Sequence, residues 1–171
     1  SAGTLTDAPE DFEVFQAIFD TNVLAMVATF EPFIAAMRAR RQGVLVGIGS
    51  VAGVRGLPGA GAYSASKAAV RAYCESLRVE LRGSGVQVVT LAPGFIATPM
   101  TARNPYRMPF LMPVDRFARQ AVRAIESGDR YRVIPWPMAW VGRLLRLVPD
   151  ALYDAVAAGR KRKPRVHRDP E

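Results

Sequence analysis

Cysteine and histidine are the scarcest residues of this 171-residue chain, which has one of each. The single cysteine, Cys74, excludes an intrachain disulfide and is typical of a protein from a reducing compartment, so we expect a cytoplasmic location. The single histidine, His167, lies in a charged C-terminal segment and is a poor candidate for catalysis. We expect no metal site.

Long hydrophobic runs are also missing. No uninterrupted apolar stretch reaches the roughly 18–20 residues that span a bilayer, and the N-terminus lacks the basic-then-apolar pattern of a signal peptide. Half of the residues are apolar and 22% are charged, which is ordinary for a globular protein. The length predicts one domain, which we place at 1–158, followed by a basic tail at 159–171.

The net charge of +8 is concentrated in that tail. Residues 160–171 hold six basic and two acidic side chains, so they supply +4 of the total. Two interpretations stay open: a solvated, disordered terminus, or a weak contact with an anionic membrane surface or polyanion. A nucleic-acid partner is not expected.

Helical and strand patterns alternate along the chain. The hydrophobic spacing predicts helices over 7–41, 62–82 and 114–126, and short buried strands over 44–50, 86–91 and 132–134. Pro32 should bend or split the first helix, and Gly43 should stop it. This alternation predicts an α/β fold with a parallel sheet, in which ligands bind beyond the carboxyl ends of the strands, at Ser50 and at Pro93-Gly94.

A tyrosine and a lysine lie four residues apart in the second helix, at Tyr63 and Lys67. This spacing puts both side chains on one helix face, where the ammonium would favour the ionised form of the phenol. The pair suits proton transfer to or from an alcohol or carbonyl oxygen, although an exposed aromatic–cation pair has the same spacing. Ser50 can reach the same cleft, and Asn22 is either a further functional residue or a helix-bending one.

Together these residues resemble the short-chain dehydrogenase/reductase family. The resemblance covers residues 1 to about 134 and rests on Ser1-Ala2-Gly3, Asn22, Gly49-Ser50, Tyr63-x-x-x-Lys67 and Pro93-Gly94-Phe95-Ile96-Ala97-Thr98. It implies the C-terminal part of a Rossmann-like, doubly wound parallel sheet with about three strands and four or more helices. It also implies an NAD(P)-dependent oxidoreductase that interconverts an alcohol and a ketone or aldehyde.

The resemblance further implies a role for each matched residue. Tyr63 would be the general acid/base, and Ser50 would hydrogen-bond the substrate oxygen. Lys67 would bind the nicotinamide ribose, and Asn22 would hold a water that connects Lys67 to solvent. Tyr63 would also contact the cofactor. So would the remaining matches: Ile96 and Thr98 at the nicotinamide carboxamide, with Ala2, Gly3, Pro93 and Gly94 alongside.

A second glycine motif, Gly47-Ile48-Gly49-Ser50-Val51-Ala52, fits the dinucleotide fingerprint but is followed by a loop instead of a helix. We attribute its small residues to close approach of the catalytic helix. The family's own glycine-rich turn and the residue that selects NAD or NADP match nothing in these 171 residues. The opening at Ser1 suggests a piece of a longer protein, and we expect this chain alone to bind cofactor poorly.

The segment 95–112 corresponds to the family's variable substrate loop. With Trp136 and Trp140, its methionines and Phe110 predict either an apolar substrate pocket or a surface helix that packs on the helix 114–126. The two tryptophans could also lie at a membrane interface. The resemblance implies a homodimer or tetramer built from the helices 11–41 and 62–82. The alternative function is a non-catalytic module that binds a partner or a membrane surface.

Overall fold

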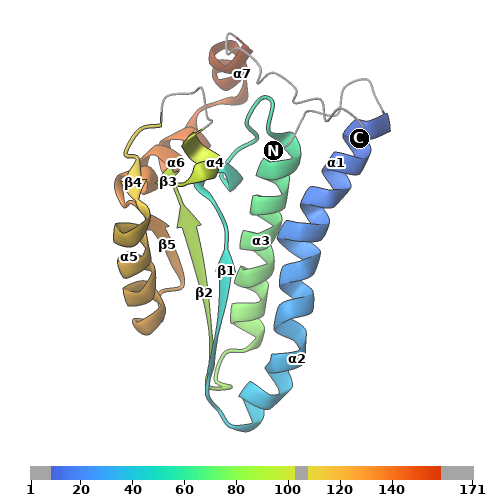
Figure 1. Cartoon of the computed structure of the whole chain (residues 1–171), viewed down its shortest axis with the longest axis vertical. Coiled ribbons are helices and arrows are strands. Elements are labelled where there is room, and N and C mark those ends of the chain that lie inside the picture. Colours follow the sequence, from blue (N-terminus) through green and yellow to red (C-terminus); the bar gives the residue numbers. More distant parts are fainter. Residues whose placement is uncertain (1–8, 103–107, 159–171) are drawn as a thin grey trace.

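The computed structural model describes residues 9–102 and 108–158. Its centre is a three-stranded parallel sheet made of β1 (Gly43–Ile48), β2 (Val86–Pro93) and β5 (Tyr131–Ile134), in the order β1-β2-β5. The strands point the same way, so their carboxyl ends meet at one edge of the sheet (Figure 1). The predicted α/β fold with three parallel strands is confirmed.

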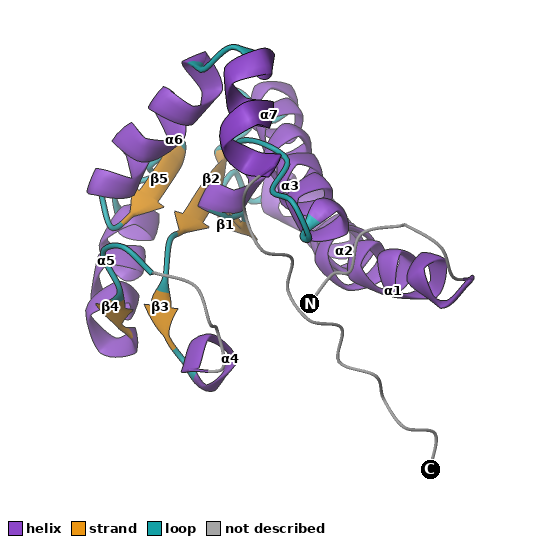
Figure 2. Cartoon of the chain, turned by 90° about the horizontal axis from the view of Figure 1, so that it is seen from above, coloured by secondary structure: helices purple, strands orange, loops and turns teal. Residues whose placement is uncertain are grey.

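Helices cover both faces of this sheet. The helices α2 (Ala25–Ala39) and α3 (Gly61–Glu80) lie on one face and α5 (Val114–Glu126) lies on the other (Figure 2). β2 is buried on both sides because its residues alternate between two cores: Val88 packs with the α3 side, whereas Val89 and Leu91 pack with the α5 side. β1 differs, since Val44 and Ile48 are 39% and 48% exposed.

The first predicted helix is interrupted at a different place from the one expected. It consists of α1 (Pro9–Phe19), a π-helical turn at Asp20–Leu24 and α2, which runs through Pro32 without a break. The predicted split at Pro32 was therefore wrong, and the alternative of a bend there stays a prediction. A proline removes one helical hydrogen bond, and the surrounding residues Phe30 and Ile34 still pack against the α3 core.

The end of that helix also differs from the prediction. α2 ends at Ala39, and the left-handed turn is taken by Arg41, whose φ is 54°. Gly43 begins β1 and does not stop the helix. A glycine is required here for space, because a Cβ would lie 2.9 Å from the Met37 Cβ.

Smaller elements frame the carboxyl edge of the sheet. A 3₁₀ turn at Val51–Gly53 follows β1, and α4 (Pro99–Ala102) follows the two-residue strand β3 (Ile96–Ala97), which pairs with β4 (Met112–Pro113). The C-terminal helices α6 (Pro137–Leu147) and α7 (Asp150–Ala158) complete the described chain. The predicted tail at 159–171, including His167, lies outside the described residues.

One helical stretch, Phe12–Ala39, is long and apolar enough to cross a membrane by length and composition. The sequence predicts no such helix, because no uninterrupted apolar run reaches 18–20 residues. The 18-residue window in this stretch is nevertheless apolar on average and holds no more than two charged residues. The same stretch packs Met26 and Phe30 into the core against α3. We therefore treat it as part of the α/β domain.

Candidate active site

Ser50 lies at the point where β1 and β2 end side by side. The two strand ends are joined by a hydrogen bond from Gly49 N to Leu91 O at 2.7 Å. Ser50 Oγ accepts a hydrogen bond from Ala52 N at 3.1 Å and lies 3.5 Å from Pro93 O. Its hydroxyl is thus fixed at the carboxyl edge of the sheet, where the fold predicts a ligand.

Tyr63 and Lys67 lie on the first two turns of α3. The Lys67 ammonium is 5.7 Å from the centroid of the Tyr63 ring, and it donates a hydrogen bond to Ile48 O at 3.0 Å. Lys67 is only 9% exposed, and this burial lowers its pKa below the ordinary value of 10.5. The cation therefore lies between the phenol and the end of β1, and the interpretation as an exposed aromatic–cation pair does not fit.

Asn22 reaches α3 from the π-helical turn. Its Nδ2 donates to Ser66 Oγ at 3.0 Å, and Ser66 Oγ donates in turn to Tyr63 O at 2.8 Å. A π turn inserts one extra residue into a helix and is often found at functional sites. Ser66 was not among the predicted site residues, because its partner Asn22 lies 44 positions away in the sequence and no local pattern marks the contact.

Two glycines let the end of β1 approach α3 closely. A Cβ on Gly47 would overlap Cys74 Sγ, and a Cβ on Gly53 would lie 2.7 Å from the Lys67 carbonyl carbon. No side chain fits at Gly47 or Gly53, so both glycines are explained by their close packing on α3. This agrees with the interpretation of Gly47-Ile48-Gly49-Ser50-Val51-Ala52 as a packing motif instead of a phosphate loop.

The segment after β2 is held by a network centred on Thr101. Its hydroxyl donates to Ile96 O at 2.6 Å, and it accepts a hydrogen bond from Thr98 N at 2.8 Å. Gly94 N donates to Ile134 O at 2.8 Å, which ties the turn to β5. Thr101 was not singled out from the sequence, and it fixes the backbone of both predicted carboxamide contacts.

The described residues fit the nicotinamide-ribose end of a dinucleotide. An ammonium carries three N–H donors, and the described residues give Lys67 one acceptor, Ile48 O, which leaves donors for ribose hydroxyls. The structure thus brings Asn22, Ser50, Tyr63 and Lys67 to one end of the sheet. Ala2 and Gly3, the other predicted cofactor contacts, lie outside the described residues.

The predicted apolar pocket is not assembled from all of its candidates. Met112 is buried in the α5 core, whereas Phe110 and Leu111 are exposed on the loop before it. Trp140 lies on α6 and Trp136 is the residue just before it, and α6 packs on β5 and the 3₁₀ turn. Both tryptophans are exposed, and Trp136 lines an open groove with residues of α6 and β5.

Comparisons with known proteins agree with this geometry. The family model described as "short chain dehydrogenase" matches residues 2–108. A curated relative, an uncharacterized oxidoreductase of Myxococcus xanthus, is 41% identical over 155 residues, covering 91% of this chain and 61% of the relative. The chain thus spans about three fifths of that relative's length.

Solved structures share the fold. A short-chain dehydrogenase from Burkholderia cenocepacia in complex with NADP has a TM-score of 0.74 at 23% identity, covering 91% of this chain and 65% of that one. A Sphingobium yanoikuyae enzyme with NADPH has a TM-score of 0.70 at 21% identity, covering 97% and 63%. A 4-hydroxyisoleucine dehydrogenase with NADH has a TM-score of 0.63 at 20% identity, covering 78% and 61%. From the match of the family model and the arrangement of Ser50, Tyr63 and Lys67, we conclude that the chain belongs to the short-chain dehydrogenase family.

Proposed function

We propose that this chain carries the proton-transfer site of an NAD(P)-dependent oxidoreductase that interconverts an alcohol and a ketone or aldehyde. The observation that carries the proposal is the placement of the buried Lys67 ammonium 5.7 Å from the Tyr63 ring, at the strand edge where Ser50 also lies. A buried ammonium beside a phenol can stabilise the negative charge that develops on nearby oxygens during proton transfer.

In this proposal each residue acts on the substrate oxygen. Tyr63 donates its phenolic proton when a carbonyl is reduced and takes a proton when an alcohol is oxidised. Ser50 donates a hydrogen bond to the same oxygen and stabilises the charge that develops there. When bound, the nicotinamide supplies or accepts the hydride.

The cofactor would be held partly by residues of this chain. The free donors of Lys67 suit the ribose hydroxyls, and the segment Pro93–Thr98 lies along the carboxyl edge of the sheet, where the carboxamide would be fixed by Ile96 and Thr98. The choice between NAD and NADP stays open. Asn22, through its link to the turn of Tyr63, would support the proton relay from Lys67.

The 171 residues alone would bind cofactor weakly. Among residues 9–102 and 108–158, β1 pairs with β2 on one side only, and its exposed Val44 and Ile48 suit a further strand and its covering helix. A fluorescence titration of NADH and NADPH against the isolated chain tests this, and tight binding of either cofactor would overturn it.

The substrate is proposed to be apolar. The observation behind this is the loop before β4, which exposes Phe110 and Leu111 near β3. An apolar substrate would bury these side chains on binding, with a favourable change in free energy of about 25 cal/mol per Å² of apolar surface.

The proposed mechanism is tested in the complete protein by Tyr63→Phe. Turnover should fall by roughly 10²–10⁴-fold, the usual contribution of a general acid/base, with cofactor binding retained. Tyr73→Phe is the matched control, because Tyr73 lies on the same helix and packs in the core. Unchanged turnover in Tyr63→Phe would refute the mechanism, and a complete protein without oxidoreductase activity would favour a non-catalytic module.

A further inference from the structure

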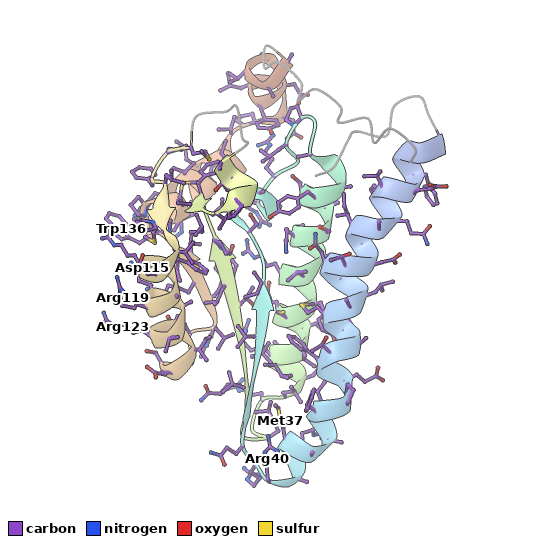
Figure 3. The ribbon with its side chains drawn as sticks, in the orientation of Figure 1. Met37, Arg40, Asp115, Arg119, Arg123 and Trp136 are labelled. Carbon is purple, nitrogen blue, oxygen red and sulfur yellow. The ribbon has the colours of Figure 1, made fainter. Side chains whose placement is uncertain are left out.

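The outer face of α6 is apolar and exposed. Four of its side chains are between 61% and 79% exposed: Trp136, Trp140, Leu144 and Leu147. At 100° per residue their spacings of four, four and three residues place them within one narrow stripe of the helix. Figure 3 shows the Trp136 side chain pointing away from the sheet.

This helix is firmly attached to the rest of the fold. Met138 and Gly142 are buried on the opposite face of α6, and a Cβ on Gly142 would lie 3.3 Å from Val54. Arg55 donates hydrogen bonds to Leu145 O and Val148 O at the C-terminal end of the helix. The exposed stripe is thus presented on a rigid support and is not a loosely packed segment.

Arginines flank the apolar stripe on one side. An open groove of about 620 Å³ runs between α6, β5 and α3, and its charged lining consists of five arginines and one aspartate: Arg71, Arg130, Arg132, Arg143, Arg146 and Asp129. The aspartate is already paired with Arg132. Five arginines and one aspartate give the groove lining a net formal charge of +4 (5 − 1), so this surface is positive.

Aromatic rings hold two of these arginines in place. The Arg71 guanidinium lies 4.6 Å from the centroid of the Tyr131 ring, and the Arg143 guanidinium lies 5.1 Å from that of Trp140. Stacked guanidinium groups keep their N–H donors free at the ring edge, in a geometry that suits phosphate oxygens. The groove therefore offers preorganised donors for anions next to an apolar stripe.

We propose that this face of α6 docks on an anionic membrane surface. Tryptophans and leucines enter the boundary between headgroups and acyl chains, and arginines beside them bind lipid phosphates, which is the combination seen in interfacial helices. A second copy of the chain is the competing occupant. It is disfavoured because a symmetric contact on this face would bring the arginines of both copies together without acidic partners.

The proposal goes beyond the proposed oxidoreduction and does not depend on it. The chain has two tryptophans, and both lie on this stripe, so intrinsic fluorescence reports the contact directly. We expect a blue shift, and quenching by brominated acyl chains, when the 171-residue chain is mixed with vesicles of phosphatidylcholine and phosphatidylglycerol. Binding should weaken with added salt and be much weaker with phosphatidylcholine alone.

Two paired variants make the test specific. Arg143→Gln with Arg146→Gln should weaken vesicle partitioning roughly 25-fold, from about fivefold for each arginine near an anionic surface. Arg38→Gln with Arg40→Gln is the matched control, which removes the same charge at the far end of α2 (Figure 3) and should leave partitioning nearly unchanged. Equal effects of the two pairs would overturn the proposal.

Two further outcomes would overturn the proposal. Sedimentation with vesicles but without tryptophan quenching would mean that the basic tail binds, and would overturn the role of α6. A concentration-dependent blue shift without lipid, together with a doubled mass in light scattering, would assign this face to a second copy instead.

Discussion

Asn22 donates a hydrogen bond to Ser66 across 3.0 Å, between two residues 44 positions apart in the sequence. Ser66 Oγ in turn donates a hydrogen bond of 2.8 Å to the carbonyl oxygen of Tyr63. The π-helical turn that carries Asn22 is thereby fixed to the turn of α3 that carries the proposed acid/base. The asparagine therefore has a positioning role as well as its proposed part in proton relay.

The first prediction concerns the strength of this link. Asn22→Ala should lower the free energy of unfolding by about 1–2 kcal/mol, since it removes a hydrogen bond and leaves Ser66 Oγ, in a fully buried residue, without its donor. Because the two groups pair, Asn22→Ala with Ser66→Ala should cost about 1 kcal/mol less than the sum of the single changes. Urea unfolding measures both quantities.

Ser76→Ala is the control for that cycle. Ser76 is also on α3, but its hydroxyl bonds to Glu80 on the exposed side of the helix. It should change stability by no more than about 0.5 kcal/mol. Strict additivity of the Asn22 and Ser66 changes would mean that the bond contributes nothing to stability in solution.

The second prediction concerns the close approach of β1 to α3. In Gly47→Ala the new methyl would overlap the sulfur of Cys74, a side chain that is itself fully buried, so the protein should lose about 1–3 kcal/mol of stability. With Cys74→Ala in the same chain, the methyl has room and much of that loss should be recovered. Thermal melts of the four variants make the comparison, and an equal penalty in both backgrounds would show that the sulfur is not the obstacle.

The third prediction concerns pH. Burial lowers the pKa of Lys67 below 10.5, so between the lowered value and 10.5 the unfolded chain binds more protons than the folded one. The contribution of Lys67 to stability therefore rises as the pH rises through that window, and below it the folded state bears the full cost of a buried cation. The unfolding free energy of the wild type, relative to Lys67→Met, should increase as the pH approaches 10.5.

A second lysine provides the reference for this measurement. Lys161→Met removes a lysine of the C-terminal segment, which the sequence predicts to be solvated. The difference in unfolding free energy between Lys161→Met and the wild type should stay constant over the same pH range. A constant difference for Lys67→Met as well would contradict the lowered pKa.

The order of the three sheet strands and of the helices between them could be predicted, because each strand is a short, mainly apolar run bounded by glycine or proline. The short elements β3, α4 and β4 and the helices α6 and α7 were not predicted. Ser50, Tyr63 and Lys67 were predicted mainly from the resemblance to the family, since the spacing of Tyr63 and Lys67 alone is a weak signal. Strand ends and helix spacing explain only why they lie near one edge of the sheet, and their roles stay predictions. The π turn at Asp20–Leu24 could not be predicted, since it forms no hydrophobic pattern of its own and depends on contacts with α3. Ser66 could not be predicted either, because its partner Asn22 is far away in the sequence.

The last prediction concerns self-association of the chain through the helices of residues 11–41 and 62–82, from which the family resemblance implies a dimer or tetramer. Leu24 and Phe33 are 59% and 54% exposed on this helical layer, and burial in a partner would stabilise each by about 1.5–3 kcal/mol. Leu24→Glu combined with Phe33→Glu should therefore shift the mass in sedimentation velocity toward the monomer, because a charge cannot be buried there without a partner. Leu152→Glu on α7 is a control of similar exposure on another face and should leave the mass unchanged. If the double variant keeps the mass of the wild type while that mass exceeds one chain, the subunits associate through a different surface.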